Sequence, residues 1–420
     1  MRHLAALLVL VMVLTAGCGG GGGSDSLGSS TSFYSATNQS NNLLIVVEDS
    51  VAEAISASLD TYTTALSEDG YSAQTIVWSS GTAEDLRAAI RTTNGTTPIG
   101  AVLLVGDLPS AWYEQTADFG SSGSFFEQFP CDIFLMSLYP TWEDTNNNGI
   151  YDGHSLLTVD VPVSRITGTS SSINSYLAKA VDYRRNGSFV SQGAFIFKDD
   201  DWQDYRRSND FRLYDIYQNL TIYESTSNTT KAAYSGFMSS VGAEFVYQWI
   251  HSSPSSLYFE VDSSYQTMNT SEVKTANVRA SFYNLYDCSA ARFTEPNLGA
   301  TYLASDFGLA VFGTTKTGGV YDPYFFHNAL ATGHSWGEAF TIWYNSAGRN
   351  DDNWYLGMVI QGCPFLKVAG STANALTAEL PPAPPTANEM ALLQNQALID
   401  AHQTPVGSFE DYKTNHPQYF

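Results

Sequence analysis

Basic residues are scarce in this sequence of 420 residues. It has 19 Lys and Arg against 42 Asp and Glu, which gives a formal net charge of −23 at pH 7. A surface this acidic repels the phosphate backbone, so the composition argues against nucleic acid as a partner. Hydrophobic residues make up 43% of the chain, as in ordinary folded globular proteins.

Long apolar runs are also lacking beyond the first residues. Leu4 to Leu14 follow Arg2 and are too few to span a bilayer as a mature helix. Leu14-Thr-Ala-Gly-Cys18 resembles a bacterial lipobox, and a Gly/Ser tether over residues 19–41 follows it. We therefore expect a lipoprotein signal peptide over residues 1–18, lipidation of Cys18, and a membrane anchor at the outer membrane or cell surface. An ordinary cleaved signal peptide is the alternative.

Only four cysteines are present. With Cys18 lipidated, Cys131, Cys288 and Cys363 remain, and an odd number in an exported protein allows one disulfide and one free thiol. A bridge from Cys131 to Cys363 would leave Cys288 free, but the sequence leaves all three pairings open.

The remaining pattern alternates between strands and helices. We expect strands at 43–47, 72–78, 99–105, 159–166, 194–197, 221–223, 307–312, 356–360 and 364–368, and helices at 51–66, from 82 onward, 170–185, 208–219, 231–241, 324–332, 337–344 and 389–402. Such alternation predicts an α/β fold with a mostly parallel sheet flanked by helices on both faces. We expect two subdomains, residues 42–187 and 188–370, with 108–130 as a long loop, and a Pro-containing linker and tail over 371–420.

Two short apolar runs in the second subdomain each end in a reactive side chain. Residues 244–250 are followed by His251, and residues 278–286 are followed by Asp287 and Cys288. Groups just past the carboxyl ends of neighbouring parallel strands share one crevice. An imidazole beside a thiol can generate or hold a thiolate nucleophile. The backbone N–H groups of Ser252 and Cys288 are then candidate oxyanion donors.

This order of run, His, spacer, run and Cys resembles the caspase-like clan of cysteine peptidases, and its gingipain branch most. The resemblance covers about residues 42–370 and implies a caspase-like fold and a cysteine endopeptidase acting on protein or peptide substrates. It implies that His251 is the acid/base and Cys288 the nucleophile. The family usually has Gly where this chain has Ser252. Asp132 stands where gingipain-like chains carry an Asp near the substrate pocket, which implies a preference for a basic P1 side chain.

A short Asn-rich segment matches the first half of an EF-hand-like calcium loop. Its oxygen donors recur at alternate positions, with Gly at the sixth. The candidate ligands are Asp144, Asn146, Asn148, the Ile150 carbonyl and Asp152. Ser155 stands at the twelfth position, so the missing acidic ligand must come from elsewhere in the fold. We expect a structural calcium ion here, and the alternative is an Asn-rich turn.

Two other functions compete with a peptidase. Ser252 in place of Gly keeps open an inactive pseudopeptidase that acts as a surface binding protein. Gly333-His-Ser335-Trp-Gly337 fits the nucleophile elbow of serine esterases, which needs a strand before the Ser and a helix after it. The residues before Ser335 have a helical pattern, so Ser335 is better interpreted as a helix N-cap.

Overall fold

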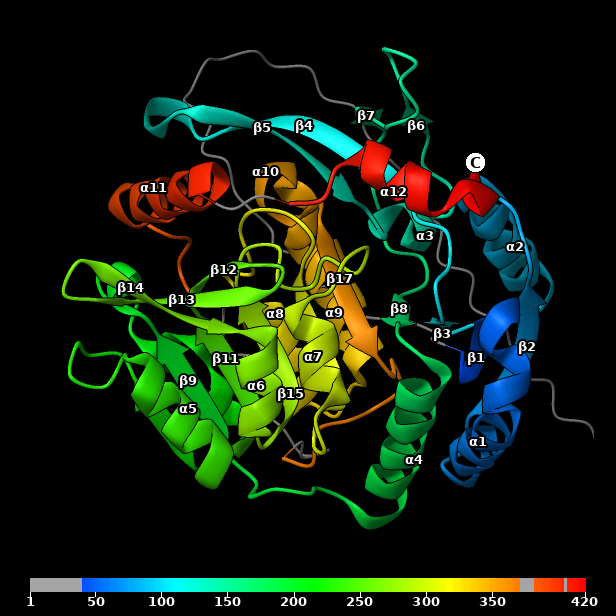
Figure 1. The fold of residues 1–420 in the computed structure, drawn as a ribbon, viewed down its shortest axis with the longest axis horizontal. Coiled ribbons are helices and arrows are strands. Elements are labelled where there is room, and N and C mark those ends of the chain that lie inside the picture. The colour runs from blue at the N-terminus through cyan, green and yellow to red at the C-terminus, as the bar shows by residue number, and fades with distance from the viewer. Residues whose placement is uncertain (1–39, 371–380, 404–405) are drawn as a thin grey trace, which may run out of the picture. The chain divides into compact units, whose positions relative to one another are not determined.

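The computed structural model describes residues 40–370, 381–403 and 406–420, and one ten-stranded sheet dominates it (Figure 1). In order across the sheet, the strands are β10 (Leu220–Tyr223), β9 (Ala194–Lys198), β11 (Ala243–Trp249), β15 (Ala280–Tyr286), β16 (Ala310–Thr314), β17 (Met358–Gly362), β8 (Val163–Ile166), β3 (Ala101–Val105), β1 (Asn42–Glu48) and β2 (Ser72–Trp78). All neighbours pair in parallel except β16 and β17. The predicted mostly parallel α/β sheet is confirmed, and it is consistent with a caspase-like fold.

The single antiparallel pairing divides the sheet into two halves that run in opposite directions. β17, β8, β3, β1 and β2 share one direction, and β10, β9, β11, β15 and β16 share the other. The carboxyl ends of β11 and β15 therefore lie at one end of the strands, and the carboxyl ends of β3 and β8 lie at the other. The sheet itself is continuous across residue 187, where we expected one subdomain to end.

Helices cover both faces of the sheet. They are α1 (Asp49–Glu68), α2 (Ala83–Thr96), α3 (Ile133–Met136), α4 (Ser170–Asn186), α5 (Lys231–Ser240), α6 (Thr270–Ala276), α7 (Leu298–Ala304), α8 (Tyr324–Ala331), α9 (Trp336–Ser346), α10 (Asp352–Tyr355), α11 (Ala387–Gln403) and α12 (Phe409–Asn415). Within the described part of the chain, no helix has the length and apolarity needed to cross a membrane.

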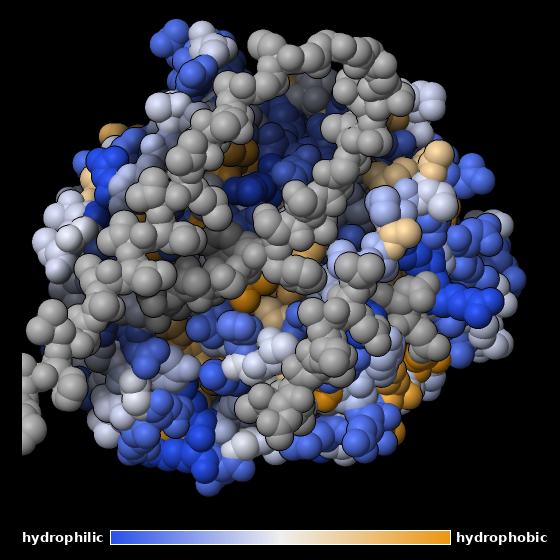
Figure 2. Space-filling view, turned by 180° about the vertical axis from the view of Figure 1, so that it is seen from behind, coloured by the Kyte–Doolittle hydropathy of each residue, from blue (hydrophilic) through white to orange (hydrophobic). Residues whose placement is uncertain are grey.

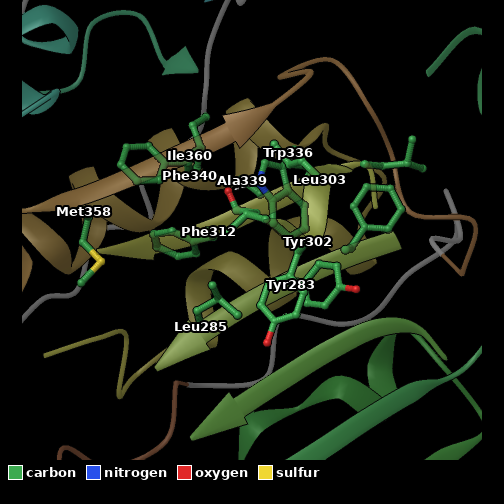
Figure 3. Close-up of a cluster of buried hydrophobic side chains, with 14 of the residues drawn as sticks. Tyr283, Leu285, Tyr302, Leu303, Phe312, Trp336, Ala339, Phe340, Met358 and Ile360 are labelled. Atoms are coloured by element: carbon green, nitrogen blue, oxygen red, sulfur yellow. Dashed lines mark hydrogen bonds between the residues drawn. The ribbon is translucent and has the colours of Figure 1, made fainter. Parts of the chain in front are cut away.

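The core lies between these layers, and consecutive residues of β15 show both faces. Phe282 packs against Trp336 of α9 with ring centroids 5.4 Å apart, while Tyr283 stacks on Tyr302 of α7 at 4.3 Å. Because successive strand residues point to opposite faces, α7 and α9 cover opposite sides of the sheet. Figure 3 shows Tyr283, Tyr302 and Trp336 within this buried cluster. All residues of β11 and β15 are buried, as expected of central strands.

Smaller sheets extend from the main one. They are β4 (Trp112–Asp118) with β5 (Ser124–Pro130), β6 (Trp142–Glu143) with β7 (Gly153–His154), and β12 (His251–Ser253) with β13 (Ser256–Val261) and β14 (Ser264–Asn269). The rear view has a mostly hydrophilic surface with small scattered apolar patches, which suits the acidic composition (Figure 2).

Three sequence predictions of local structure were wrong. Residues 108–130 are not a long loop, because β4 and β5 form an antiparallel hairpin there. Residues 208–219 form two short 3₁₀ turns, Ser208–Phe211 and Leu213–Asp215, with Arg212 between them in the left-handed region at φ 62°. A helix cannot continue through that conformation. Residues 364–368 follow β17 without strand pairing.

Candidate functional site

The His251 and Cys288 segments leave the sheet side by side. β11 and β15 are neighbouring parallel strands, and Trp249 is the register partner of Tyr286. His251 and Cys288 each come two residues later, so both emerge at the same level of the same edge. The predicted pairing of these two strands is confirmed. His251 and Cys288 are 37 positions apart, and the chain that joins them forms β12, β13, β14 and α6 before it returns in β15.

Asp287 ties the two strand ends together. Its carboxylate accepts a hydrogen bond from the Ile250 amide at 3.1 Å and another from the side-chain amide of Gln248. Gln248 lies on β11 and Ile250 directly precedes His251, whereas Asp287 directly precedes Cys288. Burial raises the pKa of Asp287 well above its ordinary value. This contact fixes the spacing of the two segments, a role that the sequence did not reveal.

The backbone around Cys288 is constrained on both sides. Ser252 donates its hydroxyl to the Cys288 carbonyl at 2.8 Å, and the Gly318 amide donates to the Cys288 sulfur at 3.1 Å. Ser289, directly after Cys288, has a φ of 58°, a conformation that costs energy for a non-glycine residue and recurs at functional sites. The Ser289 amide is already used, because it donates to the Lys316 carbonyl at 2.8 Å. Gly318 and Lys316, from the segment that follows β16, thus border the thiol.

Two carboxylates hold the imidazole of His251, which is 2% exposed. Asp201 lies 3.0 Å from Nε2, and Asp400 lies 2.9 Å from Nδ1. The indole of Trp202 packs on the ring at a centroid distance of 4.3 Å. The imidazole is therefore oriented from three sides.

Asp201 and Asp400 come from segments for which the sequence suggested no such role. Asp199 to Asp201 directly follow β9, which pairs in parallel with β11 so that Lys198 is opposite Trp249. Asp201, His251 and Cys288 therefore follow three neighbouring strands and lie at one end of the sheet. In the sequence, all three share one pattern, a polar residue shortly after a buried strand. Asp400 lies on α11, in the tail to which we assigned no function.

Electrostatics in this arrangement favour a charged imidazole and a neutral thiol. Burial alone would lower the pKa of His251, but the carboxylates of Asp400 and Asp201 outweigh it and raise that pKa to about 10. Burial of Cys288, reinforced by the charge of Asp400 and a hydrogen bond to it, raises the thiol pKa well above its ordinary value. A thiol nucleophile needs the opposite shift. These shifts favour the protonated thiol beside a charged imidazole.

Asp132 has a structural partner, contrary to its expected place in a substrate pocket. Asp132 is 1% exposed and forms a bidentate ion pair with Arg165. The Nε and Nη2 atoms of Arg165 lie 2.7 Å and 2.8 Å from the two carboxylate oxygens of Asp132. Arg165 also donates to the carbonyls of Leu108 and Pro109. A carboxylate already neutralised by a buried guanidinium cannot take a basic substrate side chain as well.

The predicted calcium loop adopts a compact turn between β6 and β7. The Asp144 carboxylate accepts from the amides of Asn148 at 3.1 Å and Gly149 at 2.9 Å. Gly149 has a φ of 88°, which glycine adopts without a side-chain clash. Asp152 accepts from the backbone and hydroxyl of Thr145. Among the described residues, no group of three or more His, Cys, Asp or Glu side chains is arranged to hold a metal ion.

Glu114 of β4 fits the acidic ligand that the loop itself lacks. Its side chain is buried, and one oxygen lies 2.6 Å from Asn146 Nδ2 and 2.9 Å from Asn148 Nδ2. In this conformation the oxygen of Asn146 accepts from the Asn148 amide at 3.0 Å, and that of Asn148 accepts from the Ile150 amide at 2.8 Å, so both side chains present their NH2 groups to Glu114. The residue types are those that a hard cation prefers, but a bound ion would require both carboxamides to turn and to give up these hydrogen bonds.

Cys131, Cys288 and Cys363 are all free and buried, so the disulfide that the odd cysteine count allowed is not formed among the described residues. Cys131 instead donates to the Leu356 carbonyl at 3.3 Å, and Cys363 contacts the Tyr62 hydroxyl. Ser335 is the N-cap of α9 in a capping box with Glu338, so its hydroxyl is engaged in a helix end as predicted. The proposed lipid site at Cys18 and the tether up to residue 39 lie outside the described residues.

Comparisons with known proteins add no relative. A scan against protein-family models finds no match to the sequence, and a search of the curated proteins finds none either. The functional argument therefore depends on the geometry of the chain itself.

Proposed function

We propose that this chain is a cysteine endopeptidase in which Cys288 is the nucleophile and His251 the acid/base. The observation that supports this most is the common register of three strand ends, which brings Asp201, His251 and Cys288 to one edge. Burial of a His and a Cys for packing alone does not require two carboxylates aimed at the imidazole.

The chemistry follows from which nitrogen of His251 each partner contacts. Asp201 holds Nε2 as a positioning residue, which leaves Nδ1, the nitrogen beside Asp400, to serve the thiol. With a substrate bound, Nδ1 would take the proton of the thiol as its sulfur attacks the scissile carbonyl. The imidazolium would then give that proton to the leaving amine, and water would hydrolyse the thioester. The backbone amides of Ser252 and Cys288 remain the candidate donors to the oxyanion.

We also propose that a calcium ion stabilises the fold at the Asp144–Asp152 loop, with Glu114 as an added ligand. The ion would be structural, because the loop belongs to the β4–β7 region and supplies no group to the Cys288 edge. Calcium in this position would join β4 to the loop through oxygen ligands from both.

We further propose that the protein is an exported bacterial lipoprotein anchored through Cys18. The lipobox-like residues and the Gly/Ser tether support this. The substrate would then be a protein or peptide outside the cytoplasm.

Hydrolysis of fluorescently labelled casein tests the peptidase proposal. The starting protein is Asp400→Ala, because Asp400 contacts His251 and its charge raises the pKa of the Cys288 thiol. We expect this variant to hydrolyse casein, and we expect the added change Cys288→Ala or His251→Ala to abolish hydrolysis. The control Cys131→Ala removes a thiol distant from the imidazole and should retain activity. A folded Asp400→Ala protein that cleaves neither casein nor a mixed peptide library would contradict the proposal and favour a surface binding protein.

A further inference from the structure

The C-terminal segment, defined here as residues 381–403 and 406–420, lies against the candidate active site. Its first helix, α11, contacts β12, β5 and the 3₁₀ turn that carries Asp201. Figure 1 shows α11 beside β12 and β13. β12 begins with His251 itself, so α11 covers the imidazole directly. The candidate site is therefore closed by a helix from the far end of the chain.

Asp400 is the residue of α11 that enters the site. It is 4% exposed and lies 2.9 Å from His251 Nδ1. Its charge also raises the pKa of the Cys288 thiol, which burial raises most. Nδ1 is the nitrogen that must receive the thiol proton in the proposed mechanism. A carboxylate this close to Nδ1 holds the imidazole in its charged form, and a charged imidazole cannot accept the proton of the thiol.

The C-terminal segment is fastened on both sides of Asp400. Before it, Leu393 and Ala397 are buried in the main core. After it, the Gly407 carbonyl accepts from Arg292 at 2.7 Å, and the Gly407 amide donates to Glu295 at 3.0 Å. These contacts hold α11 in one position, so the insertion of Asp400 is not the chance placement of a loose tail.

No strand of the ten-stranded sheet comes from the C-terminal segment. The last strand of the sheet, β17, ends at Gly362, and all ten strands lie between residues 42 and 362. Asp201, His251 and Cys288 all belong to that part as well. Movement of α11 away from the sheet would therefore uncover the site without removing any strand or any proposed catalytic group.

We propose that the C-terminal segment is a built-in inhibitor of the peptidase, with α11 as the cover and Asp400 as the group that blocks the His251–Cys288 pair. This proposal rests on the proposed function and concerns the regulation of the same site. The full chain is then latent, and it gains activity when α11 is displaced. In the latent state, α11 of the same chain occupies the cleft, and a substrate peptide takes its place in the active state.

Alkylation of Cys288 by iodoacetamide at pH 7, followed by mass spectrometry of the full chain, measures whether the site is covered. Thiolate fraction changes about tenfold per unit of thiol pKa, so we expect Asp400→Ala to raise the labelling rate by roughly tenfold or more. Leu393→Ala retains Asp400 but weakens the docking of α11, and we expect it to raise the rate as well. The controls are Asn395→Ala on the exposed side of α11 and Glu410→Gln on the exposed side of α12. Both should label as slowly as the wild type.

The same proteins, assayed on labelled casein, separate the two proposals. If Asp400→Ala and Leu393→Ala label no faster than the wild type, the inhibitory cover is wrong. It is also wrong if the wild type cleaves casein as fast as these variants, although the peptidase proposal then stands. If the variants label rapidly but cleave nothing, the cover stands and the peptidase proposal fails. Hydrogen exchange over α11 should show faster exchange in Leu393→Ala than in Asn395→Ala.

Discussion

Replacing Asp132 by Ala should destabilise the fold by an amount that a substrate-binding residue would not produce. The change leaves the guanidinium of Arg165, which is 2% exposed, without its counter-ion. Removing one partner of a buried ion pair typically costs about 3–5 kcal/mol, because the remaining charge stays desolvated. The carbonyls of Leu108 and Pro109 still accept from Arg165, so we expect a loss near the lower end of this range.

Urea denaturation followed by tryptophan fluorescence measures this loss as a lower unfolding midpoint. The double change Asp132→Leu with Arg165→Met removes both charges, and we expect it to recover much of the stability. The control pair is Glu68 and Arg185, which form an ion pair at 2.9 Å on the surface. Glu68→Ala should leave the midpoint unchanged, since exposed pairs are screened by water.

The opposite result would restore the substrate interpretation of Asp132. That result is an Asp132→Ala protein with unchanged stability and a changed preference for the P1 side chain. The structural argument would then be refuted, because a buried Arg165 cannot lose its counter-ion without a measurable cost.

Two further predictions concern the calcium loop and a buried histidine. Calcium should raise the melting temperature of the wild type, and Glu114→Gln should reduce this rise, whereas the exposed Glu143→Gln should not. Burial lowers the pKa of His327 to about 4, below the roughly 6.5 of an unfolded histidine. The stability that depends on neutral His327 is therefore fully present above a pH of about 6.5 and is lost as the pH falls toward 4. The loss of folding stability is about 3 kcal/mol at most, at 1.36 kcal/mol per pKa unit. Between pH 7 and pH 4.5, the urea midpoint of His327→Gln should therefore fall less than the midpoints of the wild type and of His334→Gln. A calcium response independent of Glu114, or equal acid sensitivity in all three proteins, would contradict these two arguments.

The sequence could predict those parts of the site that are determined by residues close together in the chain. His251 and Cys288 each follow a short buried strand, and the sequence-adjacent pattern is enough to bring them to a sheet edge. Thr82 with Asp85 and Ser335 with Glu338 form capping boxes, which are local as well.

The parts that the sequence could not predict depend on contacts between distant segments. Nothing near Asp400 in the sequence indicates that α11 will dock on β12, because docking is decided by the shape of a surface built from other elements. Asp132 meets Arg165 across 33 residues, and the resulting pair reverses the expected function of the carboxylate. The cysteines illustrate the same limit, since an odd count suggests a bridge while the fold buries each thiol among its own partners.

The central position of β17 has a consequence for how the chain is assembled. A chain synthesised only as far as Thr314 contains nine of the ten strands, in two groups of five and four that have no pairing to each other in the finished sheet. Until Met358–Gly362 arrive, β8 and β16 would each present an unpaired edge, and such edges invite pairing with other chains. Joining the halves is thus a late step in synthesis, and α11 can dock only on a sheet that is already complete.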